Sequence, residues 1–216
     1  MKSQRNGFAQ PHFSSRSISF YKCVDFFRIK KWKKSGAGFT LIELMLVLFF
    51  TGILITVVFS LYDWHNKIYY YQQGLVQTSA SSRTAVTTMQ TYVAQANQVL
   101  ASASVSGTTY TTSANTLVLQ LPAIDSSNNI VSGKWDEAAF YPSGSNFYFR
   151  LEPDAASSRR QTYKLLSDSL SSISLTYDNA TMSMVKEVTV NFKNQLQVKN
   201  QTVTSNLQQN MYLANY

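Results

Sequence analysis

Few side chains in this sequence could carry chemistry, and the position of Glu43 most needs an explanation. Glu43 is the only charged residue in the apolar run from Phe39 to Tyr62. A carboxylate inside a membrane-spanning helix costs about 2.5–3.5 kcal/mol on insertion scales, so it normally has a partner. The chemistry indicated here is the pairing of a carboxylate with a cation, since buried opposite charges attract far more strongly than charges in water.

The rest of the chain offers no catalytic or cofactor-binding pattern. After residue 38 the sequence has one histidine, His65, and no cysteine. It has no metal-ligand spacing, glycine-rich phosphate loop or nucleophile elbow. Asp136 and Glu137 are adjacent, so on a strand they would point to opposite faces, and we interpret them as a solvated pair. The sequence therefore predicts a protein that is not an enzyme and has no cofactor or metal.

Two minor alternatives concern the polar residues of the C-terminal part. Asp125 with Asn128 and Asn129, or Asp154, could supply oxygen ligands to calcium, but they lack the spacing of an EF-hand loop. Arg159, Arg160 and Lys164 could form a basic patch or simply a charged turn.

The charge of the chain is concentrated at its start. The formal net charge is +8, but residues 1–38 hold nine of the 19 basic residues and only one of the 11 acidic ones, Asp25. Residues 39–216 are therefore neutral, which gives no strong signal for nucleic-acid binding. The single cysteine, Cys23, also lies in the basic segment, so no disulfide can form within the remainder.

The apolar run is long enough to cross a membrane. Leu44 to Leu61 contains no charged residue, and the full run would span roughly 36 Å as a helix. Lysines precede it at 30, 31, 33 and 34, whereas Lys67 is the nearest that follows. The positive-inside rule then predicts a single-pass protein of the cytoplasmic membrane with a cytoplasmic N-terminus. An aromatic cluster suits the outer interface: Tyr62, Trp64, Tyr69, Tyr70 and Tyr71.

Three interpretations compete for this segment. A cleaved secretory signal needs a small-residue site after the apolar core, and SLYDWHNK offers none. A plain signal anchor explains neither Glu43 nor the small residues 35–38 that precede the run. The third interpretation, which explains both, comes from a resemblance.

The segment from Lys33 to Leu44, KKSGAGFTLIEL, resembles the class III signal of type IV prepilins and type II secretion pseudopilins. The resemblance implies that a prepilin peptidase cleaves after Gly38 and that Phe39 becomes the N-methylated terminus. It also implies that Glu43 pairs with the terminal amine of a neighbouring subunit during assembly. The alternative is an intramolecular pair with the amine of Phe39 itself.

The helix is expected to continue beyond the membrane, to about residue 104. Val86, Met89, Val93, Ala96 and Leu100 recur at helical spacing and should pack on the body. Gly74 is a point where the helix could bend, and ASASVSG over 101–107 should end it. Ser60 stands where many major pilins have a helix-bending proline, which favours a minor pilin or pseudopilin.

Short strands and polar turns are expected after Gly107. The order of one long helix followed by strands predicts an α+β, type IV pilin-like fold with an antiparallel β-rich domain. The ending Met211–Asn215 and the strand layout resemble PilW/PulJ-like minor pilins. The expected strands are Leu117–Leu121 ended by Pro122, Ala138–Tyr141, Phe147–Leu151, Tyr163–Leu166, Ile173–Tyr177, Val185–Phe192 and one within Val203–Leu213.

The predicted organisation is a cleaved leader (1–38), a transmembrane and filament-core segment (39–62), an amphipathic helical continuation (63–106) and a β-rich domain (107–216). The resemblance implies a structural subunit, most simply a minor pilin, whose partners are prepilin peptidase, other pilin subunits, the assembly platform and the membrane. After processing it would enter an extracellular or periplasmic filament. The alternatives are a type II secretion pseudopilin, a competence pilus component, or a membrane-anchored binding domain that does not polymerise.

Overall fold

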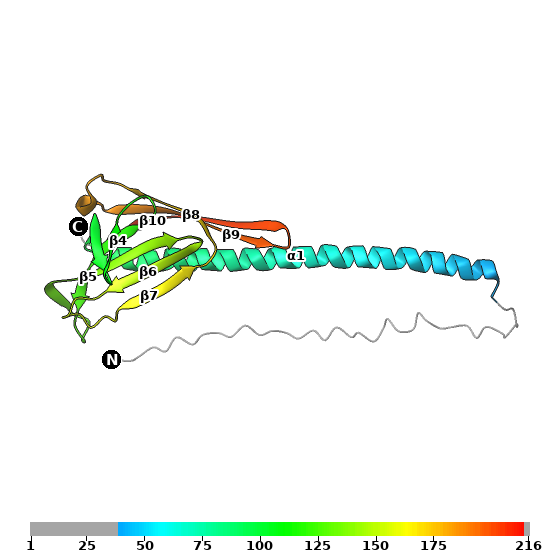
Figure 1. The fold of residues 1–216 in the computed structure, drawn as a ribbon, viewed down its shortest axis with the longest axis horizontal. Coiled ribbons are helices and arrows are strands. Elements are labelled where there is room, and N and C mark those ends of the chain that lie inside the picture. The colour runs from blue at the N-terminus through cyan, green and yellow to red at the C-terminus, as the bar shows by residue number, and fades with distance from the viewer. Residues whose placement is uncertain (1–38, 214–216) are drawn as a thin grey trace, which may run out of the picture. The chain divides into compact units, whose positions relative to one another are not determined.

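The computed structural model describes residues 39–213, which form one long helix followed by β-strands (Figure 1). The leader with Gly38, and residues 214–216, lie outside the described residues. The chain divides after Ile53 into two units. The described part of the first unit consists of Phe39–Ile53, helical from Leu41 onward. The second holds the remainder of helix α1 (Leu41–Gln95) and all the strands of the described chain.

Helix α1 ends at Gln95, so the predicted continuation to residue 104, and the helical segment 63–106 with it, was too long. The Ala96 N–H bonds the Val93 carbonyl at 3.1 Å, a tight last turn, and the Asn97 N–H already bonds the Gln120 carbonyl at 2.8 Å. Strand pairing therefore replaces the helix from residue 97 onward. The segments concerned are β1 (Gln98–Val99), β2 (Ser102–Val105) and its hairpin partner β3 (Thr108–Thr111).

The residues that were expected to end the helix have a strand pattern. In β2 the serines at 102 and 104 are exposed, while Ala103 and Val105 are buried. This alternation has the period of two that strands require. Small residues also suit a helix end, so the composition of ASASVSG does not by itself separate the two structures.

The described strands form antiparallel sheets. The five-stranded sheet has the order β1-β4-β5-β6-β7 and the three-stranded sheet the order β10-β9-β8. The bounds are β4 (Leu117–Ile124), β5 (Ile130–Ser143), β6 (Asn146–Glu152), β7 (Thr162–Ser167), β8 (Leu170–Tyr177), β9 (Glu187–Val198) and β10 (Gln201–Tyr212), with a short 3-10 turn at Met182–Met184. The α+β class is confirmed, as are the predicted strands, although most are longer than expected and the one predicted from Val185 begins at Glu187.

Pro122 does not end its strand, contrary to the prediction. It lies inside β4 opposite Trp135, and the register with β5 shifts between Pro122 and Ile124. The pairing of β4 with β1 covers only Leu119 and Gln120. Among the described residues, Pro122 therefore pairs with a strand on the β5 side only, and a missing N–H is tolerated on the other side.

The core of the second unit lies between the helix and the inner faces of the two larger sheets. Phe147, Phe149 and Leu151 of β6 alternate with exposed or half-buried residues, as do Val188, Val190 and Phe192 of β9. The predicted helix stripe is confirmed for Val86, Met89 and Val93, which are buried. Ala96 is also buried and Leu100 is half-buried, but both follow the end of the helix.

Gly74 allows close approach of a strand pair, a role that its sequence position does not indicate. A Cβ at this position would lie 2.9 Å from a methyl of Val198 and 3.2 Å from one of Val203. Helix α1 runs through Gly74 without interruption. The absence of a side chain therefore lets the β9–β10 hairpin lie against the helix backbone.

Candidate functional site

The first turn of helix α1 is capped by Thr40. The backbone N–H of Glu43 bonds the Thr40 carbonyl at 3.1 Å and the Thr40 Oγ1 at 3.3 Å. Thr-x-x-Glu is the spacing of a capping box, a signal for a helix start that the sequence carries.

The carboxylate of Glu43 has no hydrogen-bond or ion-pair partner among the described residues. A complete capping box would have it accept from the Thr40 N–H, and that bond is not formed in the described chain. An acidic group in the first helical turn is favoured by the helix dipole, but this does not neutralise its charge. Glu43 therefore remains available to a cation from outside the described residues.

The predicted cleavage site is the bond between Gly38 and Phe39. Phe39 precedes the helix and is 78% exposed. Gly38 lies outside the described residues, so the cleavage after it stays a prediction.

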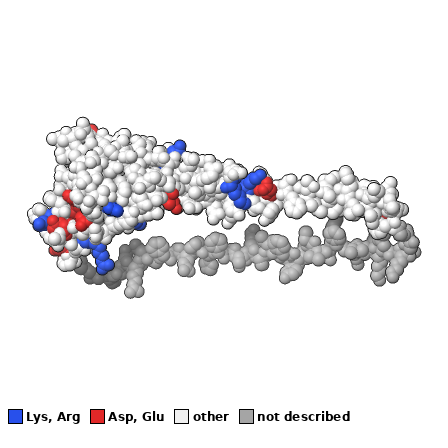
Figure 2. Space-filling model, viewed as in Figure 1, with Lys and Arg blue, Asp and Glu red and all other residues white. Residues whose placement is uncertain are grey.

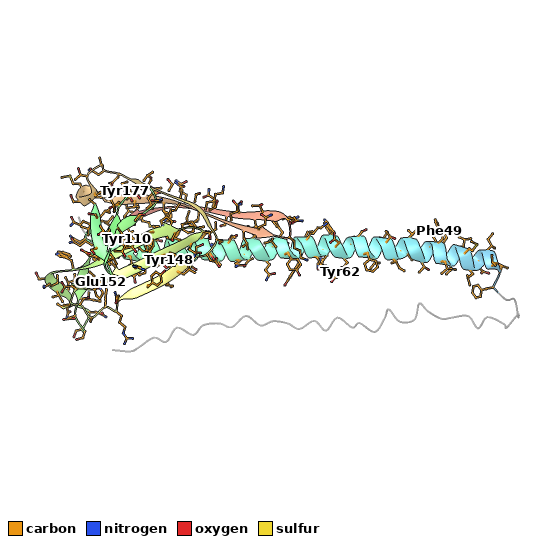
Figure 3. The ribbon with its side chains drawn as sticks, viewed as in Figure 1. Phe49, Tyr62, Tyr110, Tyr148, Glu152 and Tyr177 are labelled. Carbon is orange, nitrogen blue, oxygen red and sulfur yellow. The ribbon has the colours of Figure 1, made fainter. Side chains whose placement is uncertain are left out.

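The apolar part of the helix is uncovered. Every residue from Phe39 to Tyr62 is exposed, and Phe49 and Tyr62 point outward from the helix (Figure 3). Two hydroxyls in this run bond carbonyls one turn back, Thr51 to Val47 at 2.7 Å and Ser60 to Thr56 at 3.0 Å. Because their polar hydrogens are used internally, they do not interrupt the apolar surface. By length and composition this helix can cross a membrane.

A polar boundary follows the apolar run. The Lys67 ammonium lies 2.6 Å from the Asp63 carboxylate, one turn nearer the apolar run. The aromatic side chains Tyr62, Trp64, Tyr69 and Tyr71 are exposed, as expected for an interfacial belt. Tyr70 differs: it is half-buried, and the ammonium of Lys199 lies 3.8 Å from its ring centre.

Asp136 is not a solvated residue, contrary to the prediction. It is fully buried on β5, and its carboxylate accepts from Arg159 Nη1 at 2.9 Å, Ser157 Oγ at 2.9 Å and the Asp154 N–H at 2.8 Å. Arg159 also donates to the Pro122 carbonyl and to Gln95. The Arg159–Arg160 segment is thus a turn fixed by a buried ion pair. No sequence pattern signalled this pairing, since the partners lie 23 residues apart.

Residues 125–129 form a polar turn that is stabilised by its own hydrogen bonds. The Asp125 carboxylate accepts from the N–H groups of Ser127 and Asn129 and from the Asn129 side chain. These bonds, chiefly the one from the Asn129 backbone, lower the pKa of Asp125. Among the described residues no group of three or more His, Cys, Asp or Glu side chains is placed to hold a metal ion.

A tyrosine ladder runs from strand β3 across β5, β6 and β7 of the five-stranded sheet, on the face away from the core. Tyr110, Tyr141, Tyr148 and Tyr163 follow one another with ring centres 4.6, 5.6 and 5.3 Å apart. Figure 3 labels Tyr110 and Tyr148, which come from β3 and β6. The Arg150 guanidinium lies 4.8 Å from the centre of the Tyr163 ring. Burial raises the pKa of Tyr141, and a hydrogen bond with Tyr110 raises it further.

No protein-family model matches this sequence, and neither a curated protein nor a solved structure shows significant similarity to it.

Proposed function

We propose that this chain is a structural subunit of a type IV pilus-like filament, a minor pilin rather than an enzyme. It would be inserted in the cytoplasmic membrane as a prepilin with its N-terminus inside, be cut after Gly38 and be N-methylated at Phe39. It would then join an extracellular or periplasmic filament through the first half of its helix.

The observation that carries this proposal is the environment of Glu43. The residue sits at the third position of an otherwise uncharged, uncovered helical run, four residues after Phe39. Cleavage after Gly38 would create an ammonium at Phe39, next to the same apolar surroundings. A carboxylate and an ammonium that are each costly in lipid stabilise one another when they pair.

The arrangement of the helix supports a polymerising subunit over a simple anchor. An anchor needs only enough apolar residues to cross the bilayer, whereas helix α1 continues to Gln95 and supplies buried residues to the core of the α+β body. The apolar run and the folded body therefore share one helix.

The proposal is tested by the mass of the mature protein and of its N-terminal peptide. In cells that contain a prepilin peptidase we expect a chain beginning at Phe39 and carrying one added methyl group. Gly38→Val should block cleavage, whereas the matched change Gly36→Ala should not. Uncleaved protein, or a terminus other than Phe39, would contradict the proposal and favour the membrane-anchored binding domain. A correct terminus with no filament incorporation would also favour that alternative.

The choice among a type IV pilus, a type II secretion pseudopilus and a competence pilus depends on the partner subunits. Co-purification of the processed chain with filaments, followed by identification of the major subunit, would distinguish them.

A further inference from the structure

The charged side chains next to the apolar run form a narrow band. From Leu44 to Ser82 the only Asp, Glu, Lys or Arg residues are Asp63 and Lys67. On the face seen in Figure 2, the charged atoms beside the uncharged part of the helix also gather in one band. Charge is therefore sparse here and confined to one level of the helix.

The β9–β10 hairpin adds a third charge at nearly the same level. Its two-residue turn is formed by Lys199 and Asn200, with φ angles of 41° and 63°, between the paired residues Val198 and Gln201. The ammonium of Lys199 lies 3.8 Å from the ring centre of Tyr70. The turn is thus fixed beside the helix, and its lysine is exposed.

Helix geometry sets the height of these groups above a bilayer. If the hydrocarbon layer ends at Tyr62, Lys67 follows by about 7.5 Å and Tyr70 by about 12 Å of helix. The headgroup layer on each side is roughly 5–7 Å thick. The Lys67 ammonium reaches one turn back to Asp63, so it lies within that layer. Lys199 lies just above it on the ring of Tyr70, and its exposed side chain is long enough for its ammonium to leave the ring and reach that layer.

A groove is present at the same level. Its volume is about 730 Å³, and it lies between helix residues Trp64–Leu75 and the start of β10. The apolar wall of the groove is formed by Ile68, Tyr71 and Leu75. Its polar groups come from Lys67, Gln201 and Thr202. An apolar wall beside an ammonium and hydrogen-bonding side chains matches the glycerol and phosphate of a phospholipid.

We propose that this collar (Asp63, Trp64, Lys67, Tyr71, Lys199 and Gln201) binds the headgroups of anionic phospholipids. The two lysines outnumber the single acid, so the collar carries a net positive charge that complements an anionic surface. The hairpin turn thereby rests on the membrane and fixes the body against it. This rests on the membrane-spanning part of the proposed function and not on filament formation.

The test uses the full chain with Cys23→Ser in lipid nanodiscs and a single fluorescent probe. The probe is attached at Gln201→Cys in the collar, or at the exposed Ala180→Cys on the loop after β8 as control. We expect a spin label on the lipid headgroup to quench the Gln201→Cys probe at least twice as strongly as the Ala180→Cys probe. Equal quenching at the two positions, or disulfide-linked dimers of the Gln201→Cys variant in place of quenching, would overturn the proposal.

A second measurement tests the lysines. Each lysine near an anionic surface should raise the preference for anionic over neutral lipid about fivefold. Lys67→Gln with Lys199→Gln should therefore reduce the enrichment of phosphatidylglycerol around the protein, whereas Lys164→Gln on β7 should not. Unchanged enrichment in the double variant would overturn the assignment.

A third probe, at Leu54→Cys, tests the membrane-spanning segment separately. Labels on the lipid acyl chains should quench it, and an absence of quenching would refute the membrane-spanning segment and not the collar.

Discussion

Arg159 Nη1 lies 2.9 Å from the carboxylate of Asp136, and this contact fixes a surface turn to the buried middle of strand β5. Asp136 is fully buried and Arg159 nearly so, with 14% of its side chain exposed. Two further hydrogen bonds, from Ser157 and the Asp154 N–H, satisfy the carboxylate. The pair therefore works as part of a closed network, in which removing one member leaves a charge without a counter-charge.

Breaking this pair should cost much of the stability of the body. Arg159→Leu leaves the Asp136 carboxylate buried without its cation, which we expect to lower the free energy of unfolding by about 3–5 kcal/mol. Denaturant unfolding of the full chain in detergent micelles measures this. Adding Asp136→Asn to the variant removes the buried charge and should recover part of the loss. A double variant no more stable than Arg159→Leu would contradict the electrostatic explanation.

Adding a single methyl group at Gly74 should destabilise the fold. Gly74→Ala relieves the entropic cost of a helical glycine, about 1 kcal/mol, but its Cβ would lie 2.9 Å from Val198. We expect the collision to prevail and the midpoint of thermal unfolding to fall. Gly52→Ala is the matched control, because a Cβ there would have no atom of the described residues within 4 Å beyond its own stretch of helix. If both variants are stabilised to the same extent, the hairpin does not lie against Gly74.

Glu137 and Glu152 should make stability depend on pH. The two residues are paired across β5 and β6. Burial raises the pKa of Glu137, and the charge of Glu152 raises it further. A carboxyl with a raised pKa in the folded state stabilises the fold at low pH, and this contribution is lost as pH rises through the folded-state value. Glu137→Gln should therefore stabilise the protein at pH 7, by about 0.2–1 kcal/mol, and flatten the pH profile above pH 4.5. Unfolding curves across that range measure both effects; a profile that stays equally steep would contradict the assignment.

The tyrosine ladder should stabilise the outer sheet face through ring contacts. Tyr148→Ala removes two ring pairs, each worth about 0.5–1.5 kcal/mol beyond area burial. We therefore expect a loss of at least about 1–3 kcal/mol in the free energy of unfolding. Tyr148→Phe keeps the rings and removes only the hydroxyl that accepts from Asn146, so it should cost less. Equal losses in the two variants would show that the hydroxyl, and not the stack, is important.

Glu43 should matter for assembly and not for folding. Under the proposed function, Glu43→Leu should be cleaved and methylated normally yet be at least tenfold depleted from purified filaments. The readouts are N-terminal mass and the amount of the subunit per filament. Thr40→Val, which removes the capping hydroxyl but keeps the carboxylate, should assemble far better. Normal incorporation of Glu43→Leu would contradict a role in subunit pairing.

Features with a local pattern were predictable from sequence. The apolar run, the stripe of Val86, Met89 and Val93, and the alternation of Val188, Val190 and Phe192 each reflect one element and its own periodicity. The start of the helix was also accessible, through Thr40 and Glu43.

Features created by contacts between distant residues were not predictable. In the sequence Asp136 resembles half of a solvated acidic pair, and only the fold places Arg159 beside it. Gly74 looks like a weakness in a helix until Val198 and Val203 are placed against it. Short alternating segments of Ala, Ser and Val are compatible with both a frayed helix and a strand. The bond from Asn97 to Gln120, between distant parts of the chain, decides that the helix ends at Gln95.

The contact of the β9–β10 hairpin with Gly74 and Thr78 has a consequence for the order of folding. The Asn194 side chain donates to the Thr78 carbonyl across 116 positions of sequence. A ribosome completes the helix long before it makes residues 187–212. During synthesis this helix face is therefore not yet packed against the β9–β10 hairpin. Closing such long-range pairs is slow. The nascent chain would thus expose Thr78, Ser82 and their neighbours until residues 187–212 have been made and paired.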